Sequence, residues 1–199
     1  MATTNTADEP PSSTTVPEPV TTTATDYPSL QPALHLRVGT WSPTVVGSLS
    51  RGTPLTVVPL VGGTLVSEPG YPVRVDASMR GNGADYVHTD PDGGRMRLRT
   101  DLVMADDNGE TIHVHYTGIV DINADMRRIL GRSENARSTE YGHAFIHVTF
   151  ETGSMRYKAL EQGVFVGAGR FVLEEGDLKV EYRISQVCKG SGLAEEGSA

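Results

Sequence analysis

The chain has one cysteine, Cys188, among its 199 residues, so no disulfide can form within a single copy. It has no apolar run approaching the roughly 18–20 residues of a membrane-spanning helix. It also lacks an Asn-x-Ser/Thr acceptor, and its N-terminus lacks the basic-then-apolar order of a signal peptide. These absences predict a cytoplasmic protein without a membrane partner.

Positive charge is scarce as well. The sequence has 17 Lys and Arg against 25 Asp and Glu, a formal net charge of −8. The basic residues are interspersed with acidic ones, and they do not form the basic stripe that nucleic-acid binding requires. We therefore expect a small-molecule substrate and no nucleic-acid partner. Exposed Val and Phe positions on a domain of this size would also allow a homodimer.

Hydrophobic residues make up only 37% of the chain, and the N-terminal stretch accounts for part of this deficit. Of the first 32 residues, nine are Thr, six are Pro and three are Ser, and none is Lys or Arg. Such a stretch cannot bury enough apolar surface to offset the entropy of ordering it. We expect a disordered leader over 1–32, one folded domain over 33–189 and a flexible tail over 190–199.

Apolar and polar residues alternate with a period of two over most of the predicted domain, which is typical of strands with one buried face. The run 95–104, for example, places Leu98 on one face and Arg97 and Arg99 on the other. The predicted strands cover nine segments: 34–38, 53–60, 73–80, 84–89, 95–104, 111–117, 143–151, 163–173 and 178–187.

Three connections between these strands, 91–94, 106–109 and 174–177, combine acidic residues with Gly and indicate hairpins. Helix signals are confined to 125–130 and 154–161. Many short strands with tight turns predict an all-β fold. We expect a single antiparallel barrel of eight to nine strands with one or two short helices, because closure removes exposed edges.

The connection 120–142 is longer than a hairpin needs and has few apolar residues, so it is either a binding loop or a solvated excursion. Gly167 and Gly169 lie within a predicted strand with no helix after them. They indicate relief of crowding in a barrel strand rather than a phosphate-binding loop.

Five short motifs follow one another in the predicted domain: 58–65 (VPLVGGTL), 81–86 (GNGADY), 107–112 (DNGETI), 150–157 (FETGSMRY) and 163–169 (GVFVGAG). In this order they resemble the domain-of-unknown-function 3237 family over about residues 34–187. The resemblance implies a compact barrel similar to calycins and lipocalins. Its fungal members resemble accessory proteins of secondary-metabolite biosynthesis, in which such barrels act as cyclases or isomerases. Two positions depart from the family pattern. Tyr86 stands where the family tends to have Trp, and Arg99 precedes Asp101 where the family often has Asp before Arg.

Acid–base chemistry is the reaction type that the residues favour. Asp85 follows two glycines at a strand start, and burial would raise the pKa of its carboxyl into the range used for proton transfer. We predict Asp85, Tyr116 and His113 as catalytic residues of a cofactor-free cyclase or isomerase that acts on an apolar metabolite. The predicted substrate-binding residues are Tyr86, Arg97, Arg99, Asp101, His115, Phe150 and Tyr157.

Two alternatives use the same barrel. One is a non-catalytic small-molecule carrier. The other is a metal enzyme in which His113, His115 and a distant histidine bind zinc or iron, although no carboxylate stands at a familiar ligand spacing. Whether the apolar or the polar face of the strands points inward decides whether the lumen is a packed core or a pocket. A packed lumen, which we expect, would bury Leu98, Leu102, Ile112, Val114 and Val148 and confine a pocket to one end.

Overall fold

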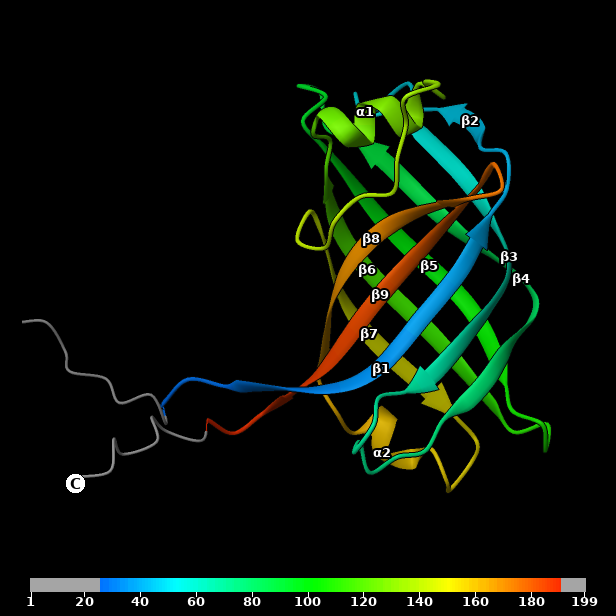
Figure 1. The fold of residues 1–199 in the computed structure, drawn as a ribbon, viewed down its shortest axis with the longest axis vertical. Coiled ribbons are helices and arrows are strands. Elements are labelled where there is room, and N and C mark those ends of the chain that lie inside the picture. Colours follow the sequence, from blue (N-terminus) through cyan, green and yellow to red (C-terminus); the bar gives the residue numbers. More distant parts are fainter. Residues whose placement is uncertain (1–25, 191–199) are drawn as a thin grey trace, which may run out of the picture.

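The computed structural model describes residues 26–190, and in this part of the chain nine strands and two short helices form. Eight strands close into an antiparallel barrel in the order β1-β9-β8-β7-β6-β5-β4-β3, with β3 pairing back to β1 (Figure 1). The predicted all-β barrel is confirmed. The elements are β1 (Ser29–Thr40), β2 (Thr44–Gly47), β3 (Leu55–Ser67), β4 (Asp76–Thr89), β5 (Arg95–Ala105), β6 (Thr111–Asp121), α1 (Ala124–Leu130), β7 (Ala144–Thr152), α2 (Lys158–Glu161), β8 (Phe165–Glu174) and β9 (Asp177–Cys188).

Residues 1–25 of the predicted leader, and the predicted tail beyond residue 190, lie outside the described residues. β1 begins at Ser29, inside the stretch that composition assigns to the leader. No helix in the described part of the chain is long and apolar enough to span a bilayer.

The alternating apolar residues fill the lumen. All five positions expected inside a packed barrel (Leu98, Leu102, Ile112, Val114 and Val148) are at most 7% exposed. Burying an aliphatic side chain stabilises a fold by about 1.5–3 kcal/mol. The filled lumen is therefore the main source of stability, and the expectation of a packed interior is confirmed.

β4 differs from the expected pattern, because the predicted strands 73–80 and 84–89 fall largely within this one strand. Its register with β5 shifts between Arg80 and Ala84, and Gly81 has a φ of 67°. This is a bulge, which glycine accommodates without steric penalty. A bulge interrupts the alternation, so the sequence pattern looks like two strands.

The long connection 120–142 is fixed to the barrel. Its first part forms α1, which covers one end of the lumen (Figure 1). Further along, the backbone N–H of Thr139 donates to the carbonyl of Phe171 at 2.8 Å, and the N–H of Phe171 donates to Thr139 Oγ1 at 3.0 Å. This segment therefore satisfies backbone groups of β8 beyond the last pair that β8 forms with β7.

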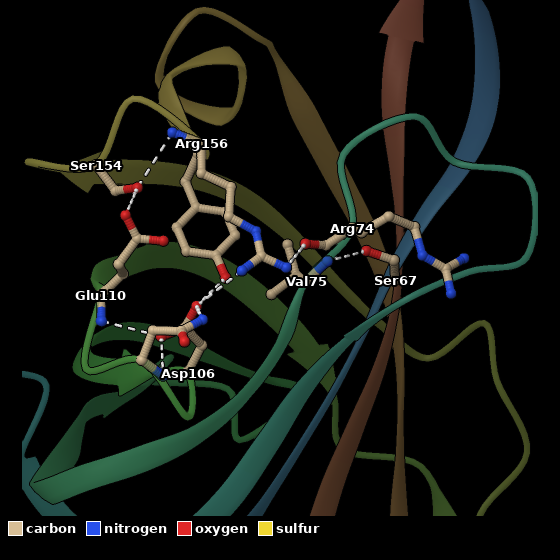
Figure 2. A network of polar contacts seen from close by, with 9 residues as sticks. Ser67, Arg74, Val75, Asp106, Glu110, Ser154 and Arg156 are labelled. Atoms are coloured by element: carbon tan, nitrogen blue, oxygen red, sulfur yellow. Dashed lines mark hydrogen bonds and ion pairs between the residues drawn. The ribbon is translucent and has the colours of Figure 1, made fainter.

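The opposite end of the barrel, beside α2, is closed around the buried carboxylate of Asp106 (Figure 2). It accepts hydrogen bonds from the backbone N–H groups of Asn108 and Glu110, both at 2.9 Å, from Tyr157 Oη at 2.8 Å and from Arg156 Nη1 at 3.2 Å. Burial acts to raise the pKa of Asp106, but the donors outweigh it and the pKa is lowered. Asp106 thus holds the β5–β6 turn against the segment that leads into α2.

Candidate functional site

Asp85 lies inside the barrel near mid-height, opposite Thr100 on β5, which is in turn opposite Tyr116 on β6. Its carboxylate is 7% exposed and accepts hydrogen bonds from Thr100 Oγ1 and, at 3.3 Å, from Tyr116 Oη. No ion pair with another described residue offsets its charge. Burial raises the pKa of Asp85 to about 6, and the two hydroxyl donors lower it only in part.

The space around this carboxyl is filled. The rings of Tyr116 and Tyr182 are in contact, with centroids 5.3 Å apart, and both side chains are fully buried. Burial, followed by the nearby charge of Asp85, raises the pKa of both phenols. The structure thus brings together Asp85 and Tyr116, but in a packed core whose ends are covered by α1 and α2 (Figure 1).

The third predicted catalytic residue, His113, lies on the outer face of β6. Its Nε2 is 3.3 Å from Asp101 Oδ1, and the Nδ1 of His115 is 2.8 Å from the same oxygen. His113 and Tyr116 are three residues apart on one strand, so their side chains must point to opposite faces. The structure therefore does not bring His113 to Asp85.

The other predicted substrate-binding residues are divided in the same way between the outside and the inside. On the outside, the Arg99 guanidinium lies over the Tyr86 ring at 4.9 Å, and Arg97 donates to both carboxylate oxygens of Asp90 at 2.7 and 2.9 Å.

The two inward-facing members, Phe150 and Tyr157, have structural partners. Phe150 packs edge-on against Phe165 with ring centroids 5.1 Å apart, and Tyr157 donates to Asp106. Neither contacts the Asp85 carboxylate.

Metal ligation has little support in residues 26–190. No group of three or more His, Cys, Asp or Glu side chains is placed to hold an ion there. His113 and His115 both contact Asp101, and no third histidine joins them.

A groove of about 950 Å³ crosses the outer wall of the barrel over strands β5 to β9. One row of residues runs through it, each member opposite the next on the neighbouring strand: Arg97, Ile119, Phe145, Ala168 and Arg183. The middle of the groove is therefore apolar, and each end of this row carries a guanidinium group.

Two histidines lie beside the apolar middle of the groove. His143, directly before β7, and His147, on β7, flank Phe145 in the sequence, and both line the groove. Neither imidazole makes a hydrogen bond or ion pair with another residue in the described chain. Histidine is the side chain most often used for proton transfer near neutral pH. The groove thus combines an apolar surface with two imidazoles that have no hydrogen-bond partner within residues 26–190.

Glycines explain why the wall is hollow at this place. Gly118 on β6 and Gly167 on β8 take lumen-facing positions on either side of Ile146. A Cβ at Gly118 would lie 2.6 Å from Ile146 Cγ2 and 2.6 Å from the carbonyl oxygen of Phe145, and one at Gly167 would lie 2.9 Å from Ile146 Cγ1. Because these positions have no side chain, β6 and β8 can lie closer to the side chains that fill the lumen, and the outer surface is recessed there.

The sequence profile of the family described as "Protein of unknown function (DUF3237)" matches residues 28–187. The chain belongs to this family. No protein with a curated description matches the sequence.

Solved structures that share the DUF3237 barrel include a conserved protein of unknown function from Rhodopseudomonas palustris. It is 22% identical with a TM-score of 0.64, and the match covers 80% of this chain and 97% of that one. A β-barrel-like protein from Acinetobacter baumannii is 22% identical with a TM-score of 0.61, covering 87% and 99%. An enzyme from Penicillium herquei is 16% identical with a TM-score of 0.52, covering 81% and 95%. These likenesses show a common fold.

For this DUF3237 chain, the sequence assigned one residue of the groove, Arg97, to substrate binding and none of the others. A signal for the others was present. Phe145 stands on the polar face of its strand, between His143 and His147, and it is 58% exposed. A large apolar residue on an outer face, flanked by polar residues, is the pattern of a binding surface.

Proposed function

We propose that this DUF3237 protein binds a small, largely apolar organic molecule in the outer groove and promotes its isomerisation or cyclisation by proton transfer at His147. The observation that carries the proposal is an apolar groove beside unpartnered imidazoles. Its volume of about 950 Å³ lies within the roughly 300–1,000 Å³ of small-molecule sites.

Access favours the groove over the lumen. A ligand reaches Phe145 and Ile119, which are 58% and 41% exposed, without moving any side chain. A ligand for Asp85 would first have to displace the tyrosines and aliphatic residues that fill the barrel. The acid–base role that the sequence assigns to Asp85 therefore passes, in this proposal, to an outward-facing histidine.

The chemistry follows from the side chains near His147. On the outer face it stands between Thr117 on β6 and Val166 on β8, next to the row that ends in Arg97. The imidazole would remove a proton from the carbon beside a substrate carbonyl and return it at another position. The cationic groups of the groove would stabilise the negative charge that develops on the carbonyl oxygen.

A non-catalytic carrier is the second candidate, and one observation favours it. The side chains that line the groove, such as Phe145, remain exposed, so the groove does not exclude water in the way that strongly catalytic sites do. A carrier would bind the same class of molecule and release it unchanged.

Deuterium exchange into 2-tetralone, an apolar bicyclic ketone with acidic protons beside its carbonyl, tests the proposal in buffered D₂O by NMR. We expect the protein to accelerate exchange, and His147→Gln to slow it about tenfold or more. Asp85→Asn is the comparison variant, because it removes the other candidate base, and it should leave the rate unchanged. Binding without exchange would identify a carrier. Loss of exchange in Asp85→Asn alone would overturn the groove proposal.

A further inference from the structure

The arginines of the groove carry information about its ligand. We infer that the groove takes a fused-ring aromatic molecule with an anionic group, such as a carboxylate or sulfonate, bound by Arg183 beside Ser185. This inference rests on the proposed function, because it names the ligand class of the same groove.

Charge distribution is the first argument. The chain as a whole has a net charge of −8. Three arginines line the groove, and each is paired with a carboxylate: Arg95 with Asp121, Arg97 with Asp90 and Arg183 with Glu68. An anionic ligand is therefore favoured only where a paired guanidinium still has unused N–H donors.

The two arginines that end the central row differ in how much of the guanidinium remains available. Arg97 uses both Nε and Nη2 on the two oxygens of Asp90. Arg183 pairs with Glu68 through Nη1 and also hydrogen-bonds the side chain of Tyr141, and its own side chain is 54% exposed. A guanidinium has five N–H donors, so Arg183 keeps donors for a second anion.

Ser185 adds a neutral donor at the same end. It lies two residues from Arg183 on β9 and faces the same side, and it also lines the groove. Its hydroxyl makes no hydrogen bond with another residue in 26–190. A guanidinium and a free hydroxyl side by side suit the oxygens of a carboxylate or sulfonate.

The width of the apolar part sets the size of the remaining molecule. Ile119, Phe145 and Ala168 stand on three adjacent strands. Neighbouring strands lie about 4.8 Å apart, so these residues cover about 10 Å across the wall. That is the length of two or three fused aromatic rings, and Arg183 on the next strand lies where a substituent at their end would reach.

Two fluorescent probes with the same aromatic skeleton test the inference. They are 8-anilinonaphthalene-1-sulfonate, which is anionic, and N-phenyl-1-naphthylamine, which is neutral. We expect the protein to bind the anionic probe about tenfold more tightly. Arg183→Gln should abolish this difference by weakening the anionic probe alone. Added salt should weaken the anionic probe only.

Three variants serve as controls. Arg51→Gln removes an exposed arginine outside the groove and should leave both probes unaffected. Glu68→Gln keeps Arg183 but removes its partner, and should tighten the anionic probe about twofold or more. Phe145→Ala should weaken both probes, because both use the apolar floor.

The outcomes separate the two proposals. If neither probe binds, or if Phe145→Ala changes neither affinity, the groove is not the site and the proposed function fails. If both probes bind equally and Arg183→Gln changes nothing, the groove binds apolar molecules but the inference of an anionic ligand is wrong. Probe binding that disappears as copies of the chain associate would show that a second copy occupies the groove, and would also overturn the inference.

Discussion

The lumen and the outer groove are the two faces of the same strands, and they separate two properties that an active site needs together. The lumen holds a desolvated carboxyl, Asp85, whose pKa is raised to about 6 and which is enclosed by tyrosines. The groove holds exposed imidazoles and guanidinium groups that a ligand can reach. A perturbed pKa is a common mark of a functional site, but it reports desolvation and not access.

A second buried carboxyl, that of Asp106, shows what sets the pKa of Asp85. It is as buried as Asp85, 5% against 7% exposed. Its pKa is nevertheless lowered, because backbone amides, Tyr157 and Arg156 donate to it, whereas Asp85 has two hydroxyls only. The number and charge of the donors decide the direction of the shift. We expect the lumen carboxyl to affect stability and the groove to affect binding, and three variants test that division.

The largest expected effect is the pH dependence of stability in Asp85→Asn. The pKa of Asp85 is about 6 in the fold against 3.8 without burial. The folded state thus holds the proton more tightly than the unfolded state, and the stability this provides is complete below pH 3.8 and lost as pH rises through 6. The difference in unfolding free energy between Asp85→Asn and the wild type should therefore shift by about 3 kcal/mol in favour of the variant between pH 3 and pH 8.

Urea denaturation at several pH values measures this gain, and a difference that stays constant with pH would contradict the assignment. Binding of N-phenyl-1-naphthylamine should be the same in both proteins, because the carboxyl faces the lumen.

Gly118→Ala has an intermediate effect and acts on both faces. The added methyl group would meet Ile146 and the carbonyl of Phe145. Overpacking of this kind costs about 1–3 kcal/mol, and it should also push the groove floor outward and weaken the neutral probe. Gly153→Ala is the matched control, since its Cβ would meet nothing within 4 Å. Equal melting temperatures for the two variants would contradict the account of how the groove forms.

The smallest effect is expected for Asp101→Asn, on the outer face beside the groove. Burial acts to raise the pKa of Asp101, but His115 and His113 outweigh it and the pKa is lowered. The stability that Asp101 contributes is therefore lost as pH falls. Because its side chain is 44% exposed, the loss at pH 7 should stay below about 1 kcal/mol. A stability loss above 2 kcal/mol, or a change in probe binding, would show that Asp101, His113 and His115 contribute more to the protein than a surface ion-pair cluster does.

The barrel was predictable because alternation is a local property, and the lumen positions followed from it. Even the separation of His113 from Tyr116 was available in the sequence, since an odd spacing on a strand reverses the face. The groove was not. It depends on the register that aligns Arg97, Phe145 and Arg183 from separate strands, and on the depression that Gly118 permits, and neither is encoded within any single segment.

Barrel closure also has a consequence for biosynthesis. β1 pairs with β9, so that Leu34 stands opposite Ile184, 150 positions later in the chain. Until β9 has left the ribosome, β1 can pair only with β3, and the apolar side of every strand stays open to water and to other nascent chains. Folding is therefore expected to complete only once β9 has been synthesised, at the slow rate of folds that depend on distant contacts. A chain truncated before β9 should accumulate as aggregate rather than as a smaller barrel.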